Sequence, residues 1–258
     1  MKLGIEWDYH DKGVAEEQAR RIKSSGFDAT FLDLELDRLD EIMKALNKYE
    51  IECESYHAPF NRINDMWIAG EDGEVMLSRL CRCIDDCNKY EVPVAVVHLS
   101  SGKNPPRMND IGFERYDRLM EYAGRQGITV AYENIRRLDN VAYMLENYPQ
   151  AGFCWDVGHE ACYTFGMEFM PLFGKRLAAV HIHDNTAIYD EDKHWLPYDG
   201  VIDMDKVAQH FAKCSYEGSY MLEVLPKTAQ IYNLDEFYKR AYTAAIKFAN
   251  SVAEYRKN

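Results

Sequence analysis

Short apolar runs alternate with longer stretches of helical periodicity along the whole chain. In the periodic stretches, apolar residues recur three and four positions apart, as in Leu39, Ile42, Met43 and Leu46. The short runs are apolar at consecutive positions, which is typical of strands buried on both faces of a parallel sheet. The pattern therefore predicts a regular alternation of strands and helices.

Eight such pairs are expected, each a strand followed by a helix. The strands are predicted at residues 2–6, 28–34, 50–56, 92–98, 128–133, 152–155, 177–183 and 219–224. The helices are predicted at residues 14–24, 39–49, 76–87, 116–125, 141–148, 167–173, 204–212 and 234–248. Long loops are expected at residues 58–73, 100–112 and 184–201, where Pro and Gly occur.

No linker or change of composition separates these units, so residues 1–258 are expected to form one α/β domain. A single (β/α)₈ barrel is the simplest interpretation, since this fold typically needs about 250 residues. The alternative is an open, doubly wound sheet. The near-equal units and the lack of Gly-x-Gly-x-x-Gly after the first strand weigh against it.

Composition and charge narrow the class of protein further. Hydrophobic residues make up 47% of the chain, enough for a full core. The net charge of −13 makes a nucleic-acid partner unlikely, because such proteins usually carry a basic stripe. The seven cysteines include no Cys-x-x-Cys pair, and no secretory signal or membrane-spanning run is evident, so a cytoplasmic protein with no membrane partner is expected.

The stretch from Gly152 to His159 is the first candidate for chemistry. Its apolar run ends in Asp156, and His159 follows three residues later. Asp156 could be the N-cap of the next helix or a metal ligand. This segment alone leaves both interpretations open.

Polar residues end most of the other predicted strands as well. In a (β/α)₈ barrel all these strand ends meet at one face, where active sites lie. Carboxylates crowded there would repel one another without a cation, and carboxylates mixed with imidazoles are ligands that zinc, manganese or iron prefer. The sequence thus predicts a divalent-metal site, zinc or manganese, where the carboxylates Glu133, Asp156 and Glu223 meet residues at or beyond the same face: His57, His98, His159, His181, His183, Asp192 and His194.

The order of these motifs resembles that of the xylose isomerase-like TIM-barrel superfamily, which includes sugar isomerases, sugar epimerases and endonuclease IV. The motifs are His-x-Pro at 57–59, the strand-end His98, Glu-Asn at 133–134, Asp-x-x-His at 156–159, His-x-x-Asp-Asn at 181–185, Asp-x-His at 192–194 and the last-strand Glu223. The resemblance spans nearly the whole chain. It differs at residues 196–203, where many relatives have a Gly-x-Gly turn, so the loop containing Tyr198 and Asp199 leaves the substrate open.

The resemblance implies roles for individual residues. The four metal ligands common to the epimerase branch match Glu133, Asp156, His181 and Glu223, with Glu133 and Glu223 as the catalytic base and acid. The further ligands of the endonuclease branch match His57, His98, His159, Asp192 and His194, so the resemblance implies one to three ions. Homo-oligomers occur among the relatives.

Two functions are therefore considered. The first is a metal-dependent isomerase or epimerase of a small sugar, sugar phosphate, polyol or cyclitol, which transfers a proton through a metal-stabilised enediolate. The alternative is a multi-zinc phosphodiesterase or abasic-site endonuclease. The first is favoured, because the chain is acidic and offers few basic residues for a duplex groove. A barrel that only binds a metal or ligand is a third possibility.

Overall fold

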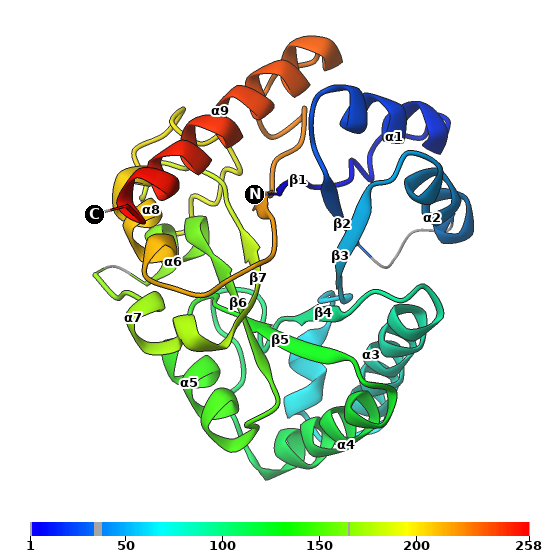
Figure 1. Cartoon of the computed structure of the whole chain (residues 1–258). Coiled ribbons are helices and arrows are strands. Elements are labelled where there is room, and N and C mark those ends of the chain that lie inside the picture. Colours follow the sequence, from blue (N-terminus) through cyan, green and yellow to red (C-terminus); the bar gives the residue numbers. More distant parts are fainter. Residues whose placement is uncertain (1, 34–37, 165, 258) are drawn as a thin grey trace.

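Eight parallel strands form a barrel at the centre of the molecule (Figure 1). The computed structural model describes residues 2–33, 38–164 and 166–257. Neighbouring strands pair in sequence order from β1 to β7, and β1 also pairs with β8. The strands are β1 Leu3–Ile5, β2 Ala29–Asp33, β3 Glu52–His57, β4 Val94–Val97, β5 Thr129–Glu133, β6 Gly152–Asp156, β7 Leu177–His181 and β8 Tyr220–Leu222.

The barrel closes between β7 and β8, just past the end of β7. Ile182 forms a parallel bridge with Leu222. The backbone N–H of Ile182 donates to Met221, and that of Glu223 donates to the carbonyl of Ile182. These bonds satisfy the two strand edges that an open sheet would leave unpaired. The predicted (β/α)₈ class is confirmed.

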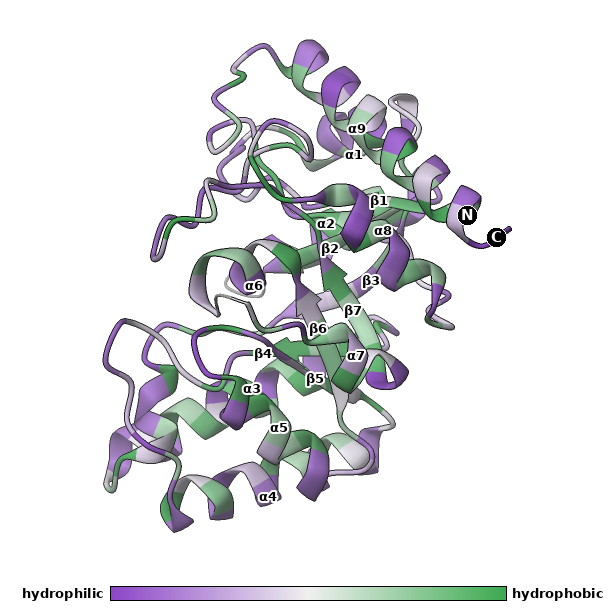
Figure 2. Cartoon of the chain, turned by 90° about the vertical axis from the view of Figure 1, so that its left-hand side faces the viewer, coloured by the Kyte–Doolittle hydropathy of each residue, from purple (hydrophilic) through white to green (hydrophobic). Residues whose placement is uncertain are grey.

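Helices surround the strands (Figure 1). Their ribbons alternate between polar and apolar residues (Figure 2), as expected for helices that pack one face on a central sheet. The helices of the described residues are α1 Ala15–Ser24, α2 Leu39–Lys48, α3 Glu71–Lys89, α4 Asp110–Gln126, α5 Leu138–Asn147, α6 Val157–Tyr163, α7 Met170–Phe173, α8 Met204–Ala212 and α9 Leu234–Tyr255, with 3₁₀ turns η1 Ile63–Trp67 and η2 Gly174–Arg176.

Most differences from the predicted elements lie in the connections. The loop expected at 58–73 contains η1, and α3 already begins at Glu71. Helix α4 begins at Asp110, inside the loop expected at 100–112, because Asn109 caps it by accepting from the N–H of Gly112. Helix α6 was not predicted. The expected end of the second strand, Leu34, lies outside the described residues.

None of the helices in the described part of the chain combines the length and apolar character needed to cross a bilayer.

Candidate metal centre

All nine residues that the resemblance implies as metal ligands lie at the C-terminal mouth of the barrel and form one connected group. Four are the last residues of their strands, and two directly follow a strand. Helix α6 supplies one residue, and the loop after β7 supplies two. In chain order the group comprises His57 on β3, His98 after β4, Glu133 on β5, Asp156 on β6, His159 on α6, His181 on β7, Asp192 and His194 in the loop, and Glu223 after β8.

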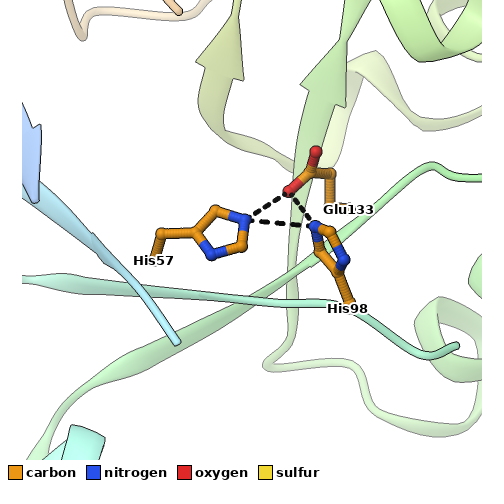
Figure 3. A group of neighbouring side chains, drawn as sticks. All are labelled: His57, His98 and Glu133. Atoms are coloured by element: carbon orange, nitrogen blue, oxygen red, sulfur yellow. Dashed lines mark hydrogen bonds and ion pairs between the residues drawn. The ribbon is translucent and has the colours of Figure 1, made fainter. Parts of the chain in front are cut away.

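The first part of the group consists of His57, His98 and Glu133 (Figure 3). The Nε2 atoms of the two imidazoles lie 3.1 Å apart. Oε2 of Glu133 lies 3.2 Å from Nε2 of His57 and 3.0 Å from Nε2 of His98. All three side chains are buried. Three ligand atoms thus converge on one point from three adjacent strands.

Hydrogen bonds fix which nitrogen of several imidazoles faces the group. Nδ1 of His57 lies 3.1 Å from the carbonyl oxygen of Ala58, and Nδ1 of His159 lies 3.1 Å from that of Asn134. A carbonyl can only accept, so each Nδ1 carries the proton. Nε2 is then the nitrogen of each ring that a metal ion could bind, as in metal-binding histidines whose other nitrogen donates to a carbonyl.

The centre of the group is formed by Glu133, Asp156, His181 and Glu223. Nδ1 of His181 lies 3.6 Å from Oε1 of Glu133 and 3.5 Å from Oε1 of Glu223. Among the described residues, both ring nitrogens of His181, Oε1 of Glu133 and Oε2 of Glu223 are buried without an aligned hydrogen bond, although Oε1 of Glu133 lies close to Nδ1 of His159. Buried polar atoms usually make such bonds, so these four atoms are suited to binding a further ligand.

Asp156 fulfils one of the two roles that the sequence left open, and its role as a metal ligand stays a prediction. It is the N-cap of α6, because its Oδ1 accepts from the N–H of His159 at 2.5 Å. Its Oδ2 also lies 3.5 Å from Nδ1 of His159, within the buried group. The next helix and the site therefore depend on the same carboxylate.

The third part consists of His159, Asp192 and His194. Oδ2 of Asp192 lies 3.0 Å from Nε2 of His159, and Oδ1 lies 3.3 Å from Nε2 of His194. Nδ1 of His194 lies 3.2 Å from the carbonyl oxygen of Glu223, which again directs Nε2 toward the site. This part reaches the central carboxylates, since Nδ1 of His159 lies 3.1 Å from Oε1 of Glu133.

Two further residues lie at or near this group, although the resemblance did not imply them as ligands. His183, which the strand-end pattern placed at the same face, is fully buried, with Nε2 3.1 Å from Oδ1 of Asp156, and its ring stacks on that of His194 at 3.9 Å. Glu6 directly follows β1, and its burial raises its pKa to about 8, although His194 and His57 act in the opposite direction. The strand-end rule applied to β1 would have pointed to Glu6.

Burial and neighbouring charges shift the pKa values of several ionisable groups in this site, in some cases in opposite directions. Burial favours a raised pKa for Glu133, but the surrounding histidines, His98 first, hold it well below its usual range. Burial and the neighbouring carboxylates raise the pKa of Glu223 well above its usual range. Burial lowers the pKa of His98 to about 4, whereas Asp192 outweighs burial and raises the pKa of His194 to about 9. Protons must balance the carboxylates here, a task that bound cations would take over.

This donor set fits divalent metal ions. Imidazole nitrogens and carboxylate oxygens suit zinc and manganese. Several of these atoms are buried without an aligned hydrogen bond. Backbone carbonyls bind the other ring nitrogen of several imidazoles and so orient the rings. Next to the group is a pocket of about 200 Å³, lined among others by Glu133, Glu223 and Phe60. It has room for a small molecule beside the metal ligands.

Comparisons with known proteins agree with the fold. A family model described as xylose isomerase-like TIM barrel matches residues 18–241. The chain is 26% identical over 153 residues to the uncharacterized protein y4fM of Sinorhizobium fredii, a match that covers 56% of this chain and 48% of that protein. The chain thus spans about half the length of this curated relative.

Two solved structures are similar over their whole length. A D-tagatose 3-epimerase-like protein is 21% identical, with a TM-score of 0.73 and coverage of 98% of this chain and 99% of that chain. The IOLI protein, solved with a zinc atom, is 17% identical, with a TM-score of 0.73 and coverage of 99% of both chains. At these identities the two structures support the fold.

Proposed function

Because the chain belongs to the xylose isomerase-like TIM-barrel family, we propose that it is a divalent-metal-dependent isomerase or epimerase of a small sugar, polyol or cyclitol. One observation carries this proposal. Glu133 at the end of β5 and Glu223 just after β8 line the same pocket, and each has a buried carboxylate oxygen without an aligned hydrogen bond among the described residues. Two such carboxylates can remove and return a proton at one carbon. The names of the similar structures, a tagatose epimerase-like protein and a zinc-containing protein, support this choice.

In this proposal Glu133, Asp156, His181 and Glu223 hold the metal ion that the reaction requires. A bound divalent ion would supply electrostatic stabilisation for negative charge that develops on substrate oxygens. Oε1 of Glu133 and Oε2 of Glu223 are the atoms that would accept and return the proton. Phe60, whose ring stacks on His98 at 4.7 Å and lines the pocket, offers an apolar face to the C–H surface of a sugar.

The test compares Glu133→Gln and Glu223→Gln with Glu146→Gln, an exposed glutamate on α5. Exchange of substrate C–H protons with deuterated water is measured on a panel of ketohexoses, their phosphates and inosose. Loss of a general acid or base costs about 10²- to 10⁴-fold in rate. We expect such losses for the first two variants and none for the third. Metal analysis of each variant separates loss of the proton carrier from loss of the ion. Full turnover in both site variants would disprove the assignment.

A second function is favoured by one specific observation. His57, His98, His159, Asp192 and His194 add two more converging ligand groups beyond the four residues that a single ion needs. Clusters of several metal ions activate water for attack on phosphate esters. Metal analysis distinguishes the two functions when combined with activity: three zinc ions per chain with cleavage of abasic DNA, and no isomerisation of any sugar, would favour the hydrolase.

A further inference from the structure

The pocket also contains hydrogen-bond donors that the proposed proton transfer does not use. Arg136, three residues after Glu133, lines the pocket. Ser100, Ser101 and Gly102, which follow β4, line it too. A substrate in this pocket would therefore meet a guanidinium and serine residues in addition to the metal ligands.

Contacts with neighbouring side chains fix Arg136, but not all of its N–H groups make hydrogen bonds. Its side chain is only 15% exposed, and its guanidinium carbon lies 4.0 Å above the centre of the Tyr163 ring. One nitrogen, Nη2, donates to Oδ1 of Asp190 at 2.6 Å. Its Nε is buried and has no hydrogen-bond partner among the described residues. A buried guanidinium N–H without a partner is unusual and indicates an acceptor that arrives with a ligand.

Asp190 is the counter-ion of this cluster. Besides Arg136 it pairs with Lys103, whose Nζ lies 2.5 Å from its Oδ2. Lys103 directly follows the pocket residue Gly102, so a single carboxylate pairs with two basic residues, of which Arg136 lines the pocket. An anionic ligand group in the pocket could bind Arg136 in the same way. Phosphates and carboxylates are the groups that arginine recognises with paired, charge-assisted hydrogen bonds.

We propose that Arg136 determines the substrate specificity of this pocket by binding an anionic substituent, a phosphate or a carboxylate, on the sugar. This inference rests on the proposed function and adds the class of substrate to it. Ser100 and Ser101 line the same pocket and are further candidates for binding the substituent. Tyr163 connects Arg136 to the metal centre, because its ring packs under the guanidinium and its hydroxyl lies 3.4 Å from Oδ2 of Asp192.

The test measures binding by calorimetry to metal-loaded protein with three ligands: D-fructose, D-fructose 6-phosphate and D-fructuronate. Arg136→Gln is compared with Arg137→Gln. Arg137 is the matched control, because it pairs with Asp139 and does not line the pocket. Metal content and melting temperature are measured for each variant, so that a folding defect is recognised.

We expect wild-type protein to bind at least one anionic ligand more tightly than D-fructose. Arg136→Gln should weaken that binding about 10- to 100-fold, the usual effect of losing a charged hydrogen bond, and leave D-fructose binding unchanged. Arg137→Gln should change neither. The stronger of the two anionic ligands identifies the substituent. Equal weakening of neutral and anionic ligands, or no anionic binding by wild-type protein, would overturn the inference.

The two proposals can fail separately. If a neutral sugar is isomerised and Arg136→Gln has no selective effect, only the specificity inference fails. If an anionic sugar binds through Arg136 without any proton exchange at carbon, the proposed function fails while the binding site remains. Release of inorganic phosphate from the phosphorylated ligand would point to the hydrolase instead.

Discussion

Gly158 shows how closely the site is packed around one histidine. A Cβ atom at this position would lie 1.9 Å from Cε1 of His183. His183 in turn reaches Oδ1 of Asp156, the carboxylate that caps α6. Any side chain at 158 must therefore displace this imidazole. The glycine is needed for space, since the helical backbone of α6 at 158 would suit other residues equally well.

Gly158→Ala should accordingly lower the free energy of unfolding by about 1–3 kcal/mol, the usual range for an overpacked core, and reduce metal binding. Urea unfolding and metal analysis measure the two effects. Gly124→Ala is the control. Gly124 lies within α4 with nothing within 4 Å of its Cβ position, so alanine should stabilise by about 0.5–1 kcal/mol. Equal stability changes in both variants would show that the ring of His183 moves freely.

The sequence allowed most of the residues in this site to be predicted, but not the contacts between them. The nine predicted ligands could be found because a barrel brings all strand ends to one face, whatever the details of packing. The contacts of His183 depend on the absence of a side chain at Gly158, and those of Arg136 depend on a loop more than fifty residues away. Such contacts depend on tertiary packing, which periodicity and strand-end position do not reveal.

At the scale of elements, the long loop after β7 is organised by Asp184. This carboxylate is fully buried and accepts four backbone N–H groups. Oδ1 accepts from Asn185 at 2.8 Å and from Ile202 at 3.0 Å. Oδ2 accepts from Tyr198 and Gly200, both at 3.0 Å. Both ends of the loop that carries Asp192 and His194 are thus fixed to one side chain.

Asp184→Asn should disturb this loop, because the amide group replaces one acceptor oxygen and leaves two backbone donors without a partner. We expect a loss of about 2–3 kcal/mol in unfolding free energy and faster proteolysis at residues 185–202. Asp203→Asn provides the control. Asp203 caps α8 by accepting from Lys206, and asparagine caps helices equally well. Unchanged proteolysis of Asp184→Asn would show that other contacts fix the loop.

The strands and the longer helices were predictable because their patterns are local and repeated. The eight strands lie where the apolar runs predicted them, and α8 has the predicted bounds. The short elements η1 and α6 were not among the predicted helices, since helices of fewer than two turns lack a readable period. The start of α6 is set by its cap Asp156, which the sequence offered as a possible N-cap, whereas η1 has no side-chain cap.

At the scale of the whole molecule, the barrel concentrates negative charge at one mouth. Glu133, Asp156, Asp192 and Glu223 lie in one connected group, within a chain whose net charge is −13. Without cations these carboxylates repel one another, and protons on the surrounding histidines must compensate. The folded state therefore has a specific reason to bind metal ions that the unfolded chain lacks.

Metal removal should then destabilise the entire fold and not the mouth alone. A ligand present at about 100 times its dissociation constant stabilises by about 3 kcal/mol, which corresponds to about 6–12 °C in melting temperature for a chain of this size. We expect EDTA to lower the melting temperature by this amount at pH 7.5, and zinc or manganese to restore it.

The difference in melting temperature with and without EDTA should shrink toward pH 5, because protons compete with metal for the imidazole ligands. His181→Gln should abolish the EDTA effect, whereas His210→Gln, on α8 away from the mouth, should retain it. Identical melting curves with and without EDTA would mean that histidine protons alone hold these carboxylates together.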